Sequence, residues 1–261
     1  MIAIYDSGIG GASVLIAVRA IAPDVDILYL ADQAHVPYGD RSPDDIRAIA
    51  LDCADWLVAQ GAVPVVVACN TASAAALGAM RARYPDTPFV GMVPAVKPAA
   101  QHSVSGVIGV MATAATLQGQ LLADVTLAHA PHMSVIGQPC HGLVEFVEAG
   151  DVDSPTVRQA VAGHVAPLIA AGADVLVLGC THYPFLRAAI AAAAPGILII
   201  DPAPAVAQQA IRAAQAHGAT IHEHGQTTYY TTGSPAHLQW QIDALGLPPG
   251  IVRARTQEQQ T

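Results

Sequence analysis

Short apolar runs alternate along this chain with longer segments in which apolar residues recur every three or four positions. The runs are rich in valine, isoleucine and leucine, as buried parallel strands are, whereas the longer segments fit amphipathic helices. We expect strands at residues 2–5, 26–32, 63–69, 88–93, 106–110, 134–136, 173–180, 197–201 and 227–232. Because strands and helices alternate, the sequence predicts an α/β protein with parallel sheets and right-handed crossovers.

Several of the expected helices have a recognisable first residue. Ser42 and Ser154 are each followed by proline, which is typical of an N-cap with proline in the first turn. Further helices are expected to end near residue 21, to follow residue 69 as far as about residue 83, and to begin near residues 204 and 234. Cys53 falls on the apolar stripe of the helix that Ser42 begins, so we interpret it as a core residue.

Two of the apolar runs end in the same way. One leads into Cys69 and the other into Cys180, and each cysteine is followed by small hydrogen-bonding residues. Ligands of open α/β folds bind at the carboxyl ends of the strands, so each half of the chain would offer one thiol there. The sequence therefore predicts two pseudo-symmetric parallel-sheet α/β domains, residues 1–95 with 205–261 and residues 96–204, with the active site in the cleft between them.

Composition excludes several other classes of protein. The chain has 261 residues, of which 53% are hydrophobic and 12% charged. Its longest apolar run, residues 188–200, contains Pro195 and Gly196 and is shorter than the roughly 20 residues that span a membrane. A net charge of -9 with 11 basic residues disfavours a nucleic-acid partner. Without a leader-like start we expect a cytoplasmic protein, and four cysteines without a C-x-x-C spacing are expected to be reduced.

The first strand leads into a glycine-rich turn at residues 6–11. Its glycines at 8 and 10 do not complete a dinucleotide fingerprint, because Ser13 stands where a third glycine or alanine belongs. The turn would instead offer backbone N–H groups to a small carboxylate. Asp6, at the end of the strand, is interpreted from the local pattern as a helix cap.

The two thiols suggest a reaction at both faces of one carbon. A thiol acts as a base only as thiolate, and a helix N-terminus lowers its pKa, so Cys69 and Cys180 would each be partly ionised near neutral pH. One thiolate would remove a proton while the other thiol delivers one to the opposite face, which inverts a stereocentre. No cofactor is expected, because the one lysine, Lys97, lies in a crossover rather than at a strand end. Cys69, Cys180, His182 and Asp6 have the chemistry of zinc ligands but not a metal-binding spacing, so we expect no metal.

An ordered series of motifs resembles that of the glutamate racemases, in the aspartate/glutamate racemase superfamily. The motifs are Asp6-Ser-Gly-Ile-Gly-Gly11, Pro37-Tyr-Gly39, Ala68-Cys-Asn-Thr71, Ala112-Thr-x-x-Thr116, Glu148-x-Gly150, Gly179-Cys-Thr-His-Tyr-Pro184 and Thr231-Thr-Gly233. The resemblance implies a cofactor-independent enzyme with glutamate bound between two domains. It further implies a supply of D-glutamate for peptidoglycan and a possible homodimer.

The same resemblance implies a role for each matching residue. Cys69 would act on D-glutamate and Cys180 on L-glutamate, with Asp6 and His182 assisting the neighbouring thiols and Glu148 as a further acidic group near Cys180. The residues expected to hold the substrate are Ser7, Pro37, Tyr38, Gly39, Asn70, Thr71, Thr116 and Thr181. Hydroxyls, an amide and backbone N–H groups can bind carboxylates without adding positive charge.

Some positions depart from the family pattern. His141 stands where proline is frequent, Gly119 and Leu122 replace frequent serine and tyrosine, and the run from Asp201 also differs. We interpret Cys140, which matches a family cysteine, as a packing residue. Three alternatives stay open: an aspartate racemase, a non-catalytic two-domain amino-acid binding protein, and a thiol redox protein.

Overall fold

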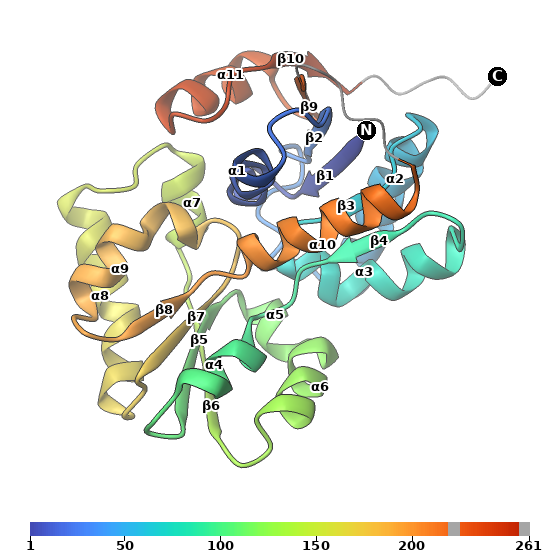
Figure 1. The fold of residues 1–261 in the computed structure, drawn as a ribbon. Helices are drawn as coiled ribbons and strands as arrows, with labels where there is room; N and C mark the ends of the chain where they lie inside the picture. Colours follow the sequence, from blue (N-terminus) through green and yellow to red (C-terminus); the bar gives the residue numbers. More distant parts are fainter. Residues whose placement is uncertain (219–224, 256–261) are drawn as a thin grey trace.

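The computed structural model describes residues 1–218 and 225–255 (Figure 1). Within these residues the strands form two separate sheets, and every strand pairing is parallel. The expected α/β fold with parallel sheets is therefore confirmed. No helix in this part of the chain is long and apolar enough to cross a membrane.

The larger sheet has six strands in the order β10-β9-β2-β1-β3-β4. Its strands are β1 (Ile2–Asp6), β2 (Ile27–Ala31), β3 (Val65–Val67), β4 (Phe89–Gly91), β9 (Thr227–Thr231) and β10 (Ile251–Ala254). Strand β1 is buried along its whole length between β2 and β3, as its apolar composition predicts. The strand β10 was not predicted, because it is short and lies at the sheet edge with two of its four residues charged or small.

The smaller sheet has four strands in the order β6-β5-β7-β8. They are β5 (Val107–Ala112), β6 (Ser134–Pro139), β7 (Val175–Gly179) and β8 (Leu198–Ile200). All strands of the larger sheet lie within residues 1–95 and 205–261, and all strands of the smaller sheet lie within residues 96–204. The exact domain limits stay a prediction. In Figure 1 the blue and cyan strands gather apart from the green and yellow ones, and the orange helix α10 returns the chain to the first group.

Helices cover both faces of these sheets. They are α1 (Ala12–Ile21), α2 (Pro43–Ala59), α3 (Asn70–Arg83), α4 (Val96–His102), α5 (Ala114–Gln118), α6 (Gln120–His129), α7 (Leu143–Glu148), α8 (Pro155–Ala170), α9 (Arg187–Ala193), α10 (Ala203–Ala216) and α11 (Pro235–Ala244), with a 3-10 turn at Tyr183–Leu186. Helix α1 packs against α10, and α2 against α3. The Ser42 and Ser154 hydroxyls accept the N–H groups of Asp45 and Val157, so both expected N-caps are confirmed.

Candidate active site

Both thiols line one cavity between the two sheets. Cys69 and Cys180 are 5% and 6% exposed, at the ends of β3 and β7. The cavity holds about 100 Å³, which suits a small metabolite rather than a polymer. It is lined by Ser7, Pro37, Tyr38, Gly39, Asp40, Cys69, Asn70, Thr71, Thr113, Ala114, Cys140, His141, Gly142, Val144, Glu145, Cys180, Thr181 and His182. Among the expected site residues, only Asp6, Thr116 and Glu148 lie behind this wall.

Cys69 occupies the N-cap position of α3. Its sulfur accepts the backbone N–H of Ala72 at 3.4 Å, and its thiol donates to the Ser7 hydroxyl at 3.8 Å. Burial raises the pKa of this thiol, and the negative charge of Asp6 raises it further, which outweighs the N–H contact at the helix start. The expectation that Cys69 is partly ionised near neutral pH is therefore wrong: the free site holds it as a thiol.

Asp6 does not cap the following helix. The N-cap of α1 is Gly11, which makes no side-chain cap, whereas Asp6 accepts the N–H of Gly8 and, at 3.2 Å, the hydroxyl of Thr181. Asp6 is completely buried, and burial raises its pKa, although the nearby His182 acts in the opposite direction. The interpretation as a cap is replaced by that of a buried carboxyl group that contacts Thr181 and lies near Cys69.

The glycine-rich turn makes room for two side chains of the other half of the chain. A Cβ at Gly8 would lie 1.9 Å from a carboxylate oxygen of Glu148, and a Cβ at Gly10 would lie 2.3 Å from Nδ1 of His182. The N–H of Ile9 donates to Glu148 Oε1 at 2.8 Å. The turn thus binds a carboxylate, as expected of its free N–H groups, but that carboxylate belongs to the protein.

Cys180 is held by side chains rather than by a helix. It is followed by a turn and by the short 3-10 segment, so no α-helix begins beside it, contrary to expectation. Its sulfur lies 3.7 Å from Nδ1 of His182, whose Nε2 lies 2.7 Å from Glu148 Oε1. Glu148 thereby orients the imidazole with Nδ1 toward the sulfur, as an acidic partner does for histidine in many enzymes.

The His182–Glu148 pair stabilises a charged imidazole. Burial alone lowers the pKa of His182, but the hydrogen bonds to Cys180 and Glu148 outweigh burial and raise it above its ordinary value. Burial alone likewise raises the pKa of Glu148, and the contacts from His182, Ile9 and Gln241 reverse this and lower it. The geometry therefore provides a base beside Cys180 that can take the thiol proton.

A buried amide without a hydrogen-bond partner in the described part of the chain lies at the start of α3. Asn70 is 3% exposed, yet among the described residues neither its amide oxygen nor its amide nitrogen has a hydrogen-bond partner. Buried amide groups are rarely left unpaired, so a bound molecule is their natural partner. Thr71 shares its hydroxyl with Thr113 at 2.9 Å and Thr116 at 3.2 Å, which places Thr116 in a supporting layer rather than in the cavity wall.

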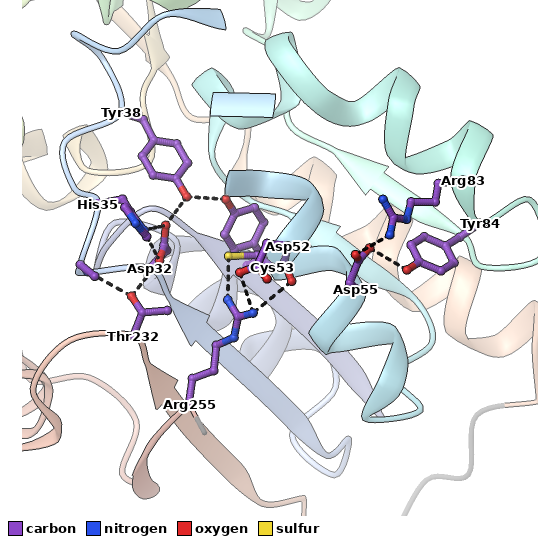
Figure 2. A network of polar contacts seen from close by, with 12 residues as sticks. Asp32, His35, Tyr38, Asp52, Cys53, Asp55, Arg83, Tyr84, Thr232 and Arg255 are labelled. Carbon is purple, nitrogen blue, oxygen red and sulfur yellow. Dashed lines mark hydrogen bonds and ion pairs between the residues drawn. The ribbon is translucent and has the colours of Figure 1, made fainter. Parts of the chain in front are cut away.

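A buried network holds the part of the cavity wall that includes Tyr38 (Figure 2). The Tyr38 hydroxyl donates to Asp32 Oδ2 at 2.5 Å and also lies 2.6 Å from the hydroxyl of Tyr5. Asp32 is completely buried and is bound in addition by His35 and by the Thr232 hydroxyl. The loop that carries Pro37 and Gly39 is thereby attached to the end of β2, and Tyr38 presents its ring rather than a free hydroxyl.

Cysteines outside the thiol pair have different surroundings. Cys53 is buried on α2, as expected, and contacts Arg255 (Figure 2). Cys140 is buried too, but it lines the cavity, so its interpretation as packing alone is incomplete. Burial, with the nearby Cys180 as the next cause, raises the pKa of Cys140 to about 12. It is thus held as a thiol.

Several other residues of the cavity wall were not predicted from the sequence. Asp40, His141 and Glu145 are exposed residues at the rim, and Thr113 is the N-cap of α5. Thr113 follows a strand end within a quoted motif, and that position was a usable signal. No local pattern marks these rim residues: Asp40 lies in the loop between β2 and α2, His141 lies just before α7, and Glu145 lies on α7.

Each of the two parallel sheets brings one thiol to a shared cavity, which is the site expected of an α/β enzyme with two acid–base groups. Residues 12–210 match the family model described as Asp/Glu/Hydantoin racemase. Over 251 residues the chain is 53% identical to a glutamate racemase of Roseiflexus sp., covering 95% of this chain and 92% of the relative. The chain belongs to the Asp/Glu/Hydantoin racemase family, so the resemblance seen in the motifs is confirmed.

Solved structures of glutamate racemases share the whole fold. A crystal structure of an isoform from Bacillus anthracis is 28% identical with a TM-score of 0.85, covering 96% of both chains. A crystal structure from Francisella tularensis in complex with D-glutamate is 26% identical with a TM-score of 0.84, covering 97% of this chain and 95% of the other. The similarity extends across both sheets rather than over one of them.

Proposed function

We propose that the protein interconverts L- and D-glutamate without a cofactor, with Cys180 and Cys69 as the two acid–base groups. In the L-to-D direction the Cys180 thiolate takes the Cα proton and the Cys69 thiol gives its own proton to the opposite face. The product complex then holds a Cys180 thiol and a Cys69 thiolate, so protons and charge balance. The reverse direction exchanges the two roles.

One observation supports this proposal above the others. Two buried thiols and the unpartnered amide of Asn70 line the same small cavity. A molecule that satisfies the amide therefore lies beside both sulfur atoms, and the relatives that share the fold act on glutamate by name.

His182 prepares Cys180 for its role as base. Its Nδ1 accepts the thiol proton over the 3.7 Å contact, and Glu148 stabilises the resulting imidazolium through Nε2. A thiolate and an imidazolium that form together in a buried site stabilise one another, because the low dielectric strengthens their attraction. The site can thus hold a thiolate at Cys180 without a net change of charge.

At the start of the L-to-D direction Cys69 is a thiol, whereas Cys180 is a thiolate. Burial and Asp6 hold it as a thiol, which is the form that donates a proton. Once it has donated, the N–H of Ala72 and the hydroxyl of Ser7 face the thiolate. These dipoles are in place before the reaction and need no rearrangement as the negative charge develops.

Neutral groups hold the substrate carboxylates. The start of α3 leaves backbone N–H groups at Asn70 and Thr71 without intrahelical acceptors, and helix N-termini favour anions. Hydroxyls of Ser7 and Thr181 complete the set, and Tyr38 and Gly39 form the facing wall with Pro37. No lysine or arginine of the described chain lines the cavity, so the rim acids Asp40 and Glu145 are free to attract the substrate ammonium.

The product has a biological use that follows from the family. We propose that its D-glutamate supplies peptidoglycan synthesis and that the enzyme works in the cytoplasm, where its amino-acid substrate is dissolved. A homodimer is the assembly we propose, and sedimentation of the purified protein at several concentrations measures it.

The function is tested by incubating the purified protein with L-glutamate in D₂O without added cofactor. Optical rotation should decay to zero while deuterium enters Cα, because each inversion replaces the Cα proton with one from a solvent-exchanged thiol. Retained rotation without deuterium at Cα would refute the proposal.

Three alternatives are separated by related measurements. An aspartate racemase would act faster on L-aspartate than on L-glutamate in the same assay. A binding protein would bind glutamate equally well after Cys69→Ser and Cys180→Ser. It would also leave the optical rotation of L-glutamate unchanged. A thiol redox protein would form a reversible Cys69–Cys180 disulfide, which a thiol titration before and after oxidation detects.

A further inference from the structure

Glu148 is held from behind by a buried glutamine of α11. Nε2 of Gln241 donates to Glu148 Oε2 at 2.7 Å and to the Glu148 backbone carbonyl at 2.8 Å. Gln241 is completely buried. It therefore fixes both the backbone and the carboxylate of Glu148, whose other oxygen contacts His182.

The amide of Gln241 has one possible orientation. Its Oε1 accepts from Nε2 of Gln33, and Oε1 of Gln33 accepts the Thr231 hydroxyl at 2.8 Å. The Thr231 oxygen in turn accepts the N–H of Gly233 at 2.9 Å. Reversing the Gln241 amide would place its oxygen against two acceptors of Glu148, so each donor in this chain of contacts has a defined direction.

This chain of contacts joins the two halves of the molecule. Thr231 ends β9 of the six-stranded sheet, and Gln241 lies on α11, between β9 and β10 in the chain. Glu148 ends α7, beside the four-stranded sheet. In Figure 1 the red helix α11 lies next to the first, blue elements, on the side toward α7. The position of the carboxylate behind His182 thus depends on how α11 is packed.

We propose that Gln241 is a positioning residue for the Cys180 half of the reaction, an inference that rests on the proposed racemase function. By holding Oε2, it turns Oε1 toward Nε2 of His182, and this contact keeps Nδ1 facing the Cys180 sulfur. Gln241 itself does not line the cavity. Its effect is on the geometry of proton transfer rather than on substrate binding.

The test compares two glutamines of the same helix. Gln241→Leu removes the amide, and Gln239→Leu removes an exposed amide that contacts only Asp243 among the described residues. Gln241→Leu should lower kcat for glutamate about tenfold to a hundredfold with KM changed less than about threefold, because small displacements of a catalytic group cost that much. Gln239→Leu should match the unmodified protein.

A spectroscopic measurement distinguishes positioning from loss of fold. The Nε2 proton of His182, identified by its absence in His182→Asn, should give an NMR signal shifted downfield by the contact with Glu148. Gln241→Leu should move this signal upfield or broaden it, and Gln239→Leu should leave it unchanged. Equal kcat values and equal signals in the two glutamine variants would overturn the proposal.

A second variant covers the case in which Gln241→Leu does not fold. Gln33 is half-buried, and Gln33→Leu frees Gln241 to rotate; it should lower kcat about threefold and shift the same signal in the same direction. Unchanged kcat and signal in this variant would refute the proposal. Failure of the proposed function is recognised separately, because the unmodified protein would then not racemise glutamate at all.

Discussion

The surroundings of Cys69 and Cys180 differ although the two strands that end in them are alike. Cys69 starts an α-helix and contacts a backbone N–H and a serine hydroxyl, with a carboxyl group nearby. Cys180 starts no α-helix and contacts a histidine that is backed by a glutamate and a glutamine. The two similar strands therefore place two chemically identical thiols in different electrostatic surroundings.

This inequality suits a reaction that begins with one thiol and one thiolate. Two thiolates in one buried cavity would repel each other, and two thiols would lack a base. In the proposed mechanism, the histidine beside one sulfur favours its thiolate form, and the carboxyl group near the other favours its thiol form. In the same mechanism, the pseudo-symmetry supplies a group on each face of the carbon, and the different surroundings of the two sulfur atoms favour the protonation state that begins the L-to-D direction.

Removal of either thiol should have the largest effect. We expect Cys69→Ser and Cys180→Ser each to lower the racemisation rate about a thousandfold or more, since a positioned acid–base group contributes about that much. Cys69→Ser should still exchange the Cα proton of L-glutamate without inversion, and Cys180→Ser that of D-glutamate. NMR of each enantiomer in D₂O measures both rates.

The control for the cysteine variants is Cys53→Ser. Cys53 is equally buried but lies outside the cavity, so racemisation should continue at the rate of the unmodified protein. If the two active-site variants exchanged the opposite enantiomers, the assignment of the thiols to the two faces would be reversed.

Gly10→Ala should disable the Cys180 side selectively. The new Cβ would lie 2.3 Å from Nδ1 of His182, so the imidazole must leave the position in which Nδ1 contacts the Cys180 sulfur. We expect about a hundredfold loss of kcat, because a displacement near 1 Å costs about that much. Exchange of the D-glutamate Cα proton through Cys69 should fall less than exchange of the L-glutamate proton.

Gly78→Ala is the matched control for this variant. Nothing in the described structure lies within 4 Å of a Cβ at Gly78, which is exposed on α3. Its activity should be unchanged and its thermal stability equal or higher, since alanine favours a helix. A Gly10→Ala enzyme as active as Gly78→Ala would contradict the close packing of the turn against His182.

Glu148→Gln should have a smaller effect with a defined pH dependence. The neutral amide keeps the shape but loses the charge that stabilises His182 as imidazolium, and we expect about a tenfold lower kcat. The folded-state pKa of Glu148 lies below its unfolded value, so its stabilisation is present above the unfolded pKa and is lost as pH falls through the folded one.

Unfolding measurements at several pH values check that sign. The free energy of unfolding of Glu148→Gln should lie furthest below that of the unmodified protein near neutral pH, and the difference should shrink in acid. A constant difference down to pH 3 would show that the carboxylate charge contributes no stability.

The sequence predicts which residues lie at the strand ends, but it does not predict the buried side chains that contact those residues. Cys69, Asn70 and Thr181 could be predicted because each follows an apolar run, and parallel strands bring their carboxyl ends to one edge. The pairing of Glu148 with the turn at Gly8 and Gly10 joins segments that no local pattern relates. The motif resemblance named Glu148 for the site but did not reveal its contacts.

The misjudged features also have a common physical cause. The pKa of Cys69 was expected to fall because a helix starts there, but burial and Asp6 depend on the packed structure and dominate. Gln241 was not predicted at all, since a buried glutamine in a helix looks like any other until its partners are known. The strand β10 is too short to be distinguished from a loop by its pattern.

Tyr38→Phe should produce the smallest of these effects, through the part of the cavity wall that Tyr38 forms. It removes the hydroxyl that joins Tyr5 to Asp32 and leaves Asp32 with His35 and Thr232, so the loop loosens while both thiols keep their contacts (Figure 2). We expect KM for glutamate to rise about threefold with kcat nearly unchanged, and the free energy of unfolding to fall by about 1–3 kcal/mol.

Tyr84→Phe is the control, because Tyr84 makes a similar 2.6 Å contact with the carboxylate of Asp55 (Figure 2), and neither residue lines the cavity. That contact is near the surface, where water replaces a lost partner, so both KM and stability should change little. A rise in KM that is equal in the two variants would show that the Tyr38 hydroxyl has no specific part in holding the wall. A fall in kcat for Tyr38→Phe would show instead that the two sides of the cavity are coupled.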